Sequence, residues 1–208
     1  MFLFRNSLPR IKGYIRFIHA TPDAPNIDIY LNDNLIYSGI SFGTVTTYIP
    51  ATPETYSIKL FKSGTKTNPL ITESLQVLPN SVSTINITFE NNEIAFFSID
   101  DTHGPSNRRL SYVRFINVAP TAPLLSLSLP DGTTLFDEAS YLETNDYYPI
   151  SPGIYNFIVS TSDSNLSKYI SDVSLSENLY ITIYIIGLYN KKPPLGYILL
   201  KDGVNNIK

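Results

Sequence analysis

Apolar and polar residues alternate along most of this chain, in short segments that are separated by turn-forming residues. Residues 14–19 alternate in this way, and residues 27–31 alternate and then end at the turn cluster of residues 32–34. A period of two is typical of strands, and no window carries a long apolar pattern with the helical period of about 3.6. The pattern therefore predicts an all-β fold.

The opening segment occurs twice, and the rest of the chain is organised around it. Its first copy, residues 14–25, reads YIRFIHATPDAP, and its second copy, residues 112–123, reads YVRFINVAPTAP. Both copies end at two prolines spaced P-x-x-P, which the interior of a strand does not tolerate. Each copy therefore predicts a half-buried strand that runs into a fixed turn.

The segments after the opening strand repeat as well, and Tyr48 corresponds to Tyr147. Polar loops are expected at residues 62–68 and 161–168. The further predicted strands are residues 27–31, 35–37, 56–60, 82–89 and 94–99 in the first copy and residues 125–129, 133–136, 155–159, 180–186 and 196–200 in the second. About seven or eight short strands per copy, with turns every 8–12 residues, are typical of a β-sandwich.

The repeat also sets the expected domain boundaries. These are an arm at residues 1–11, a first sandwich at 12–100, a linker at 101–110 and a second sandwich at 111–208. The linker is rich in residues that break regular structure. We interpret the pair Asp100-Asp101, where the linker begins, as carboxylates solvated at the end of a strand.

Composition limits the function classes. Hydrophobic residues make up 43% of the 208 residues, which is enough for a core, and the net charge of -3 leaves no basic footprint for nucleic acid. The absence of cysteine excludes disulfides, thiolate zinc sites and cysteine nucleophiles. No apolar run reaches the roughly 18 residues of a membrane-spanning helix, and residues 1–10 lack the apolar run of a secretory signal. We therefore leave location open between the cytoplasm and a surface reached without such a signal.

The first copy resembles the DUF4397 family. The residues that match the family's hallmark stretch are His19-Ala20, Pro22-Asp23-Ala24-Pro25, Asp28 and Tyr30, and a P-x-x-Y turn follows at residues 53–56. The resemblance extends over both copies, so over nearly the whole chain beyond residue 11. The second copy is degenerate, because Asn117, Thr121, Ser126 and Ser128 replace His19, Asp23, Asp28 and Tyr30.

The resemblance implies a fold and a class of location. The family is a domain of unknown function that occurs mostly in exported or surface-associated bacterial proteins, and it resembles immunoglobulin-like sandwiches. It supplies no catalytic residues. With the duplicated pattern, it leads us to expect two tandem immunoglobulin-like β-sandwich domains that act as non-enzymatic modules.

His19, Asp23 and Asp28 form a candidate metal site, because a histidine and two carboxylates could hold an ion. The alternative is that the aspartates cap backbone amides in the proline turn, with Asp28 directed outward while its neighbours face the core. The second copy lacks all three residues, so the fold does not depend on them. We predict no resident metal or cofactor, and leave open whether the three residues form a site or only hold a turn.

Catalytic groups are scarce. Only His19 and His103 could serve as the base of a Ser-His-Asp arrangement, and His103 falls in the predicted linker, where flexibility is unfavourable. The sequence has no G-x-S-x-G, no glycine-rich phosphate loop and no H-E-x-x-H, and its acidic residues single out no glycosidase pair. We predict no catalytic residues and no enzyme, and a hydrolase dependent on His19 is the least favoured alternative.

Aromatic residues suggest an alternative function. Most of the 15 tyrosines and 11 phenylalanines occupy alternate strand positions, where core packing explains them. Tyr147, Tyr148 and Tyr189, which is close to Pro193-Pro194, are expected to be exposed. If these rings anchor a ligand, the protein is a binding module for a glycan or a protein partner.

The arm has no counterpart in the repeat. Its residues Phe2, Leu3 and Phe4 could dock on an edge strand of a neighbouring molecule, and their burial would contribute roughly 5–8 kcal/mol before entropy is counted. We therefore predict a non-catalytic structural or surface protein of a bacterial cell or spore that forms homo-oligomers through this arm.

Overall fold

A computed structural model describes residues 11–104, 106–163 and 165–204. The named elements in these residues are sixteen strands, arranged in four four-stranded sheets. The predicted all-β fold is therefore confirmed. Within the described ranges, no helix has the length and apolar character needed to cross a bilayer.

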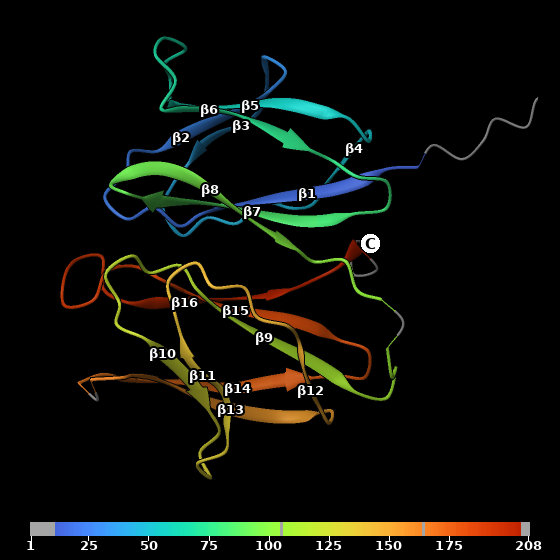
Figure 1. The fold of residues 1–208 in the computed structure, drawn as a ribbon, viewed down its shortest axis with the longest axis vertical. Coiled ribbons are helices and arrows are strands. Elements are labelled where there is room, and N and C mark those ends of the chain that lie inside the picture. The colour runs from blue at the N-terminus through green and yellow to red at the C-terminus, as the bar shows by residue number, and fades with distance from the viewer. Residues whose placement is uncertain (1–10, 105, 164, 205–208) are drawn as a thin grey trace, which may run out of the picture.

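The first unit contains two stacked sheets (Figure 1). Its strands are β1 (Gly13–His19), β2 (Ile27–Leu31), β3 (Asn34–Ile40), β4 (Ile49–Ala51), β5 (Thr55–Lys62), β6 (Ile71–Gln76), β7 (Val82–Glu90) and β8 (Glu93–Asp100). The strand orders are β4-β1-β7-β8 in one sheet and β3-β2-β5-β6 in the other. Strand β1 runs parallel to β7, whereas its other neighbour, β4, is antiparallel to it.

The second unit repeats this plan. Its strands are β9 (Ser111–Asn117), β10 (Leu125–Ser128), β11 (Thr134–Ala139), β12 (Tyr148–Ile150), β13 (Gly153–Thr161), β14 (Ser167–Leu175), β15 (Tyr180–Ile186) and β16 (Gly196–Lys201). The strand orders, β12-β9-β15-β16 and β11-β10-β13-β14, match those of the first unit one for one. Strand β9 is parallel to β15, as β1 is to β7. The immunoglobulin-like topology implied by the resemblance is not confirmed by these orders.

Four strands were not among the predicted ones, for two reasons. β4 and β12 are only three residues long, too short for a periodic pattern. β6 and β14 are the outer strands of their sheets, and each is largely exposed. Polar residues on an exposed outer strand hide the alternation on which the prediction depends.

Each unit buries an apolar core between its two sheets. In the first unit the core includes Ile15, Phe17 and Ile29, and in the second it includes Val113, Phe115 and Leu127. All six side chains are at most 1% exposed. Successive residues of a strand face opposite sides of the sheet. The core residues of β1 and of β9 occupy alternate positions, so each core covers only one face of its strand.

The other face of β1 and of β9 lies at the junction between the units. Figure 1 shows the β1–β7 sheet stacked on the β9–β15 sheet, and a third apolar cluster joins them, with Ile18 and Ile99 from the first unit and Ile116, Val118 and Tyr184 from the second. The prediction of half-buried opening strands is therefore wrong, because a second sheet covers the face that would otherwise be solvated.

Candidate functional site

The candidate metal site does not assemble. His19 is fully buried at the end of β1, its Nε2 lies 3.2 Å from the carbonyl oxygen of Pro25, and its ring meets Phe42 edge-on. Burial lowers the pKa of this imidazole, so the neutral ring is favoured. Asp23 adopts a positive φ of 61° in the turn. Among the described residues, no three histidine or carboxylate side chains come together in a way that could hold an ion.

Asp28 organises two loops. Its Oδ1 accepts hydrogen bonds from the amide of Gly39 at 2.8 Å and the hydroxyl of Ser38 at 2.9 Å, and its Oδ2 accepts one from the amide of Gly64 at 3.0 Å. Burial alone would raise the pKa of this carboxyl, but these hydrogen bonds outweigh burial and lower it. Asp28 therefore caps backbone amides, as the alternative interpretation expected, but these amides belong to two distant loops and not to the proline turn. The expectation that Asp28 is directed outward is wrong, because its side chain is buried in this network.

Charged side chains meet instead at the junction between the units. The Nη2 of Arg16 on β1 forms an ion pair with Asp202, its Nη1 donates to the carbonyl oxygen of Lys201 at 3.0 Å, and its Nε donates to Thr84 Oγ1 at 2.7 Å. Burial alone would lower the pKa of Arg16, but the charges of Asp202 and Asp101 help to raise it. One cation of the first unit is thus held by a carboxylate of the second.

Arg114 on β9 repeats this set in the opposite direction. Its Nη2 forms an ion pair with Asp101, its Nη1 donates to the carbonyl oxygen of Asp100 at 2.8 Å, and its Nε donates to Thr182 Oγ1 at 2.9 Å. The two arginines and two aspartates, which we call the junction cluster, are therefore related by the duplication. Each arginine binds the carboxylate that belongs to the other unit.

Two tyrosines contact the charged groups of the junction cluster. Tyr48 donates to Asp101 Oδ2 at 2.7 Å, and Tyr147 donates to Asp202 Oδ2 at 2.9 Å. The guanidinium carbon of each arginine lies 4.4 Å from the centre of one of these rings. Burial first, and then the nearby carboxylates, raise the pKa of both hydroxyls, so both remain donors. Cation–π contact and hydrogen bonding thus act together at each ion pair.

The junction cluster is enclosed, which decides what chemistry it can perform. Asp101 is 0% exposed and Asp202 is 1% exposed. Burial, followed by the charge of Asp101, raises the pKa of Asp202. A close carboxylate pair of this kind would suit acid–base work in a cleft, but here arginine, threonine and tyrosine donors occupy it and the junction covers it. Its geometry favours a structural role.

The interpretation of Asp100-Asp101 as solvated carboxylates is wrong for Asp101. Its amide pairs with the carbonyl oxygen of Val82 at 2.7 Å, so the backbone stays in the sheet as it leaves β8. The side chain then enters the junction. A signal was present in the sequence, because the repeat places an arginine at the same position of both opening strands, Arg16 and Arg114. A charge that is repeated at the same position of two strands, each buried on both faces, requires buried partners.

His103 packs against the second unit. Its ring stacks on Tyr180 with the centres 3.8 Å apart, and Tyr180 in turn stacks on Tyr112. Burial lowers the pKa of His103. The residue is therefore part of an aromatic stack of the second unit, although the sequence placed it in the linker.

The three tyrosines expected at the surface differ from one another. Tyr148 is 40% exposed, whereas Tyr147 is held at the junction cluster and Tyr189 packs against the core of the second unit. Tyr169 and Tyr197, which the sequence did not single out, are 54% and 41% exposed. They lie on β14 and β16, the outer strands of the second unit.

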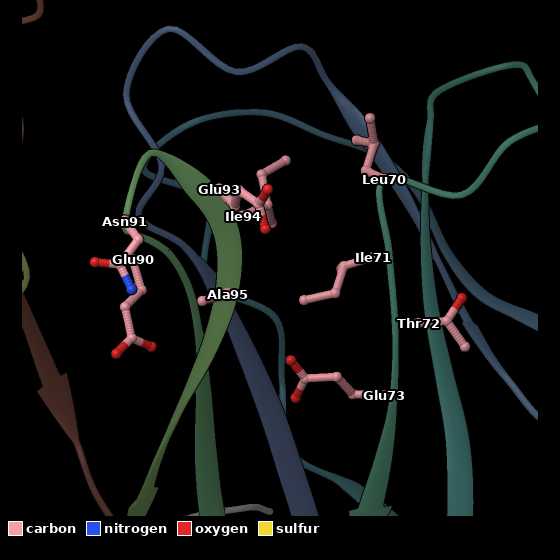
Figure 2. Close-up of a pocket in the computed structure, with 9 residues that line it drawn as sticks. All are labelled: Leu70, Ile71, Thr72, Glu73, Glu90, Asn91, Glu93, Ile94 and Ala95. Carbon is pink, nitrogen blue, oxygen red and sulfur yellow. The ribbon is translucent and has the colours of Figure 1, made fainter.

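An open slot lies between the outer strands of the first unit, β6 and β8 (Figure 2). It has a volume of about 590 Å³ and is lined by residues 70–73 on one side and by residues 90, 91 and 93–95 on the other. Figure 2 shows Ile71 and Glu73 directed from β6 toward β8. Three lining carboxylates, Glu73, Glu90 and Glu93, are exposed. The slot is therefore largely polar and negatively charged, with apolar side chains from Leu70, Ile71 and Ile94 in its lining.

A smaller cavity next to the slot borders the core of the first unit. It has a volume of about 110 Å³, shares Glu73 with the slot and is lined by Ile58, Leu75, Ile85 and Phe96. Ile58 and Ile85 belong to the apolar core, and Leu75 and Phe96 pack against it. A side chain that entered here would therefore meet apolar surface below the carboxylates.

The arm residues Phe2, Leu3 and Phe4 lie outside the described residues, so the predicted homo-oligomer contact stays a prediction.

Comparison with known proteins supports a family assignment. The family model described as a domain of unknown function, DUF4397, matches residues 13–128, which is more than half of the chain. That range contains the whole first unit together with β9 and β10. No curated protein matches the chain. One solved structure with a match is the C-terminal domain of AlgF from P. aeruginosa, which is 18% identical, covers 45% of this chain and 98% of that domain, and has a TM-score of 0.34.

The second unit repeats the strand orders and pairings of the first, so a second, similar pair of sheets follows the matched range. The chain therefore belongs to the DUF4397 family, whose function is unknown.

Proposed function

We propose that this protein is a non-catalytic structural module in which two β-sandwich units act as one rigid block. The junction cluster carries this proposal. Its four charged groups are all at most 4% exposed, and each arginine pairs across the units. Ionisable groups held in this way stabilise an arrangement of domains and are closed to a substrate.

The polar residues of the hallmark stretch support the same proposal. Asp28 caps the amides of two loops, and the buried ring of His19 contacts a backbone carbonyl. In the second unit the position of His19 is held by Asn117, whose side chain also serves the backbone, accepting from the amide of Ala119 at 3.0 Å. One position thus supports a turn in both units with two different side chains.

A location at a bacterial cell or spore surface, and an immunoglobulin-like architecture, are further parts of this proposal. They rest on what the resemblance to the family implies, since its members occur mostly in exported or surface-associated proteins and resemble immunoglobulin-like sandwiches. Immunogold labelling of intact source cells and spores with antibodies against the protein tests the location. Label confined to the interior of sectioned cells would contradict it.

Calorimetric unfolding tests the rigid block. We expect the full chain to unfold in one cooperative transition, because separating the units would expose two buried ion pairs. Two independent transitions would contradict the proposal. The variant His19→Asn, which copies the second unit, is expected to keep the fold. If the protein were a hydrolase dependent on His19, this variant would lose a turnover that the native chain shows on a broad substrate panel.

A binding module for glycans or for a protein partner is the second candidate. The observation that favours it is the exposure of the rings of Tyr148, Tyr169 and Tyr197, because exposed aromatic rings anchor many recognition sites. A glycan array compared with the triple alanine variant tests it. Binding by the native chain that the variant loses would support this function, and identical profiles would remove it.

A further inference from the structure

We propose that the slot between β6 and β8 binds the amino-terminal arm of a second copy of this chain, as an added strand. The inference deepens the proposed structural role and rests on it, because it names the contact through which rigid blocks would assemble. Five observations support it: strand order, apolar lining, comparison with the second unit, charge and length.

Both walls of the slot are sheet edges. β6 is the outer strand of β3-β2-β5-β6, and β8 is the outer strand of β4-β1-β7-β8. An outer strand presents backbone donors and acceptors on its free side, and an extended peptide can pair with them. Because both edges flank one opening, a single extended segment could reach either of them.

The walls also offer apolar surface. Ile71 and Ile94 are half-buried, and Leu70 at the mouth is 38% exposed. A smaller cavity that shares Glu73 with the slot is lined by residues of the core and by residues that pack against it. An apolar side chain placed here would be removed from water on several sides, which is the main source of binding energy for such a segment.

The second unit shows how the corresponding opening is closed. Glu73 and Ile170 occupy corresponding positions in the two units. Glu73 pairs with Ile58, and Ile170 pairs with Phe157, which is the residue of the second unit that corresponds to Ile58. Ile170 is 1% exposed, whereas Glu73 is exposed. By the same pairing Ile71 matches Lys168, whose Nζ donates to the carbonyl oxygen of Leu195 at 2.8 Å.

The chain between β15 and β16 makes this closure. Residues 187–195 form a long connection in which Leu195 is 6% exposed and Tyr189 packs against the core. The first unit joins β7 to β8 with only Asn91 and Asn92. The first unit therefore lacks the segment that supplies apolar side chains at this place, and its slot remains open.

Charge indicates what kind of segment fits. The slot carries Glu73, Glu90 and Glu93. The arm begins with the sequence MFLFRNSLPR, in which four apolar residues precede Arg5 and a second cation, Arg10, follows. The apolar residues match the lower part of the slot, and the arginines match its carboxylates.

Length and position favour the arm of another molecule. An extended arm of ten residues spans roughly 33 Å, and the six residues of β6 span roughly 20 Å, so the arm can follow the whole strand. The slot lies at the β7–β8 turn. Because β1 is parallel to β7, Gly13 lies at the opposite end of the sheet. The arm therefore joins its own unit at the end away from its own slot.

Cross-linking tests the contact directly, because the native chain has no cysteine. A mixture of the single variants Phe4→Cys and Leu70→Cys is oxidised, and disulfide-linked hetero-dimers are counted by mass spectrometry. The matched control replaces Leu70→Cys with Ile154→Cys, at a residue of the second unit that is 73% exposed. We expect at least about tenfold more hetero-dimer with Leu70→Cys than with the control, as a specific contact of several residues requires.

Two results of this experiment would overturn the proposal. One is an equal yield for Leu70→Cys and Ile154→Cys. The other is a bond that forms only inside single chains when Phe4→Cys and Leu70→Cys are placed in the same molecule, because the arm would then fill its own slot. Leu70 and Ile154 take no part in the apolar cluster at the junction, so neither result would affect the one-transition unfolding expected of the rigid block.

Charge reversal gives an independent readout in the native oligomer. Sedimentation equilibrium is expected to show self-association that weakens at least about tenfold in Glu73→Lys/Glu93→Lys and in Arg5→Glu/Arg10→Glu, and that returns when the two variants are mixed. Glu177→Lys, at an exposed turn of the second unit, is the control. A monomeric native chain, or variants that associate as the native chain does, would contradict the proposal.

Discussion

The two units agree at the face where they meet and differ at their outer edges. At the junction, Arg16 and Arg114 make the same hydrogen bonds and opposite ion pairs. At the outer edge, an exposed Glu73 stands where the second unit buries Ile170. The comparison shows that packing between the units requires the same side chains in both copies. An outer edge that only one unit closes can instead serve a contact with another molecule.

The largest expected effect is at the junction. Asp101→Ala leaves Arg114, Thr84 and Tyr48 buried without their acceptor, and we expect a loss of about 3–5 kcal/mol in the free energy of unfolding. Urea unfolding measures it. Asp100→Ala, the exposed neighbour, is the control and should cost less than about 1 kcal/mol.

The duplication adds a condition to this prediction. Asp202→Ala removes the acceptor of Arg16, Thr182 and Tyr147, so its cost should be of the same size as that of Asp101→Ala. A large cost for one aspartate and none for the other would show that the two halves of the junction cluster are not equivalent.

Exchanging the corresponding residues of the two outer strands tests whether the second unit is closed at this edge and the first is open. Ile170→Glu places a charge where the core of the second unit is closed, and we expect a loss of roughly 3 kcal/mol or more. Glu73→Ile places an apolar residue in an open slot, and the unfolding free energy should change by less than about 0.5 kcal/mol. Equal costs in chemical denaturation would mean that the first unit's slot is closed in solution.

The connection that closes the second unit depends on one glycine. Gly187 has a φ of 93°, and a Cβ at this position would overlap the carbonyl oxygen of Pro194. We expect Gly187→Ala to cost about 1–3 kcal/mol. Gly132→Ala is the control, since its φ is 91° but no atom lies within 4 Å of the added Cβ, so only the backbone cost of about 1 kcal/mol should remain. Thermal unfolding of the two variants, measured side by side, compares these two losses of stability.

The smallest expected effect is on the unfolding free energy at low pH. Hydrogen bonds hold the pKa of Asp28 below its unfolded value of about 3.9, so its contribution to stability is complete above that pH and is lost as the pH falls through the folded-state pKa. Its counterpart Ser126 cannot titrate. We expect Asp28→Asn to flatten the fall of the unfolding free energy below about pH 4. An unchanged slope between the native chain and the variant would contradict this.

Alternation and repetition were enough to predict the all-β class, the duplication and most inner strands. They could not predict β6 or β14, because the outer strand I-T-E-S-L-Q places a glutamate between its two inward apolar residues. They also could not reveal that both faces of β1 are buried. A period of two shows one apolar face, and the second face here is made by contacts with residues a hundred positions away.

The candidate site was less accessible to sequence reasoning. His19, Asp23 and Asp28 are close in sequence, which made them candidates, but Asp28 is engaged by the loops at residues 38–39 and 64. The junction cluster joins residues that are up to 186 positions apart. Only the tertiary arrangement brings such residues together, and only the repeated arginine gave a hint of it.

A double-mutant cycle on Arg16 and Asp202 tests the central claim most directly, because the two residues belong to different units. Urea unfolding of the native chain, Arg16→Met, Asp202→Asn and the double variant gives the coupling free energy between them. We predict a favourable coupling of more than about 1.5 kcal/mol, as close buried charge pairs show. A coupling near zero would contradict the account, because the charges of the two units would then not hold them together.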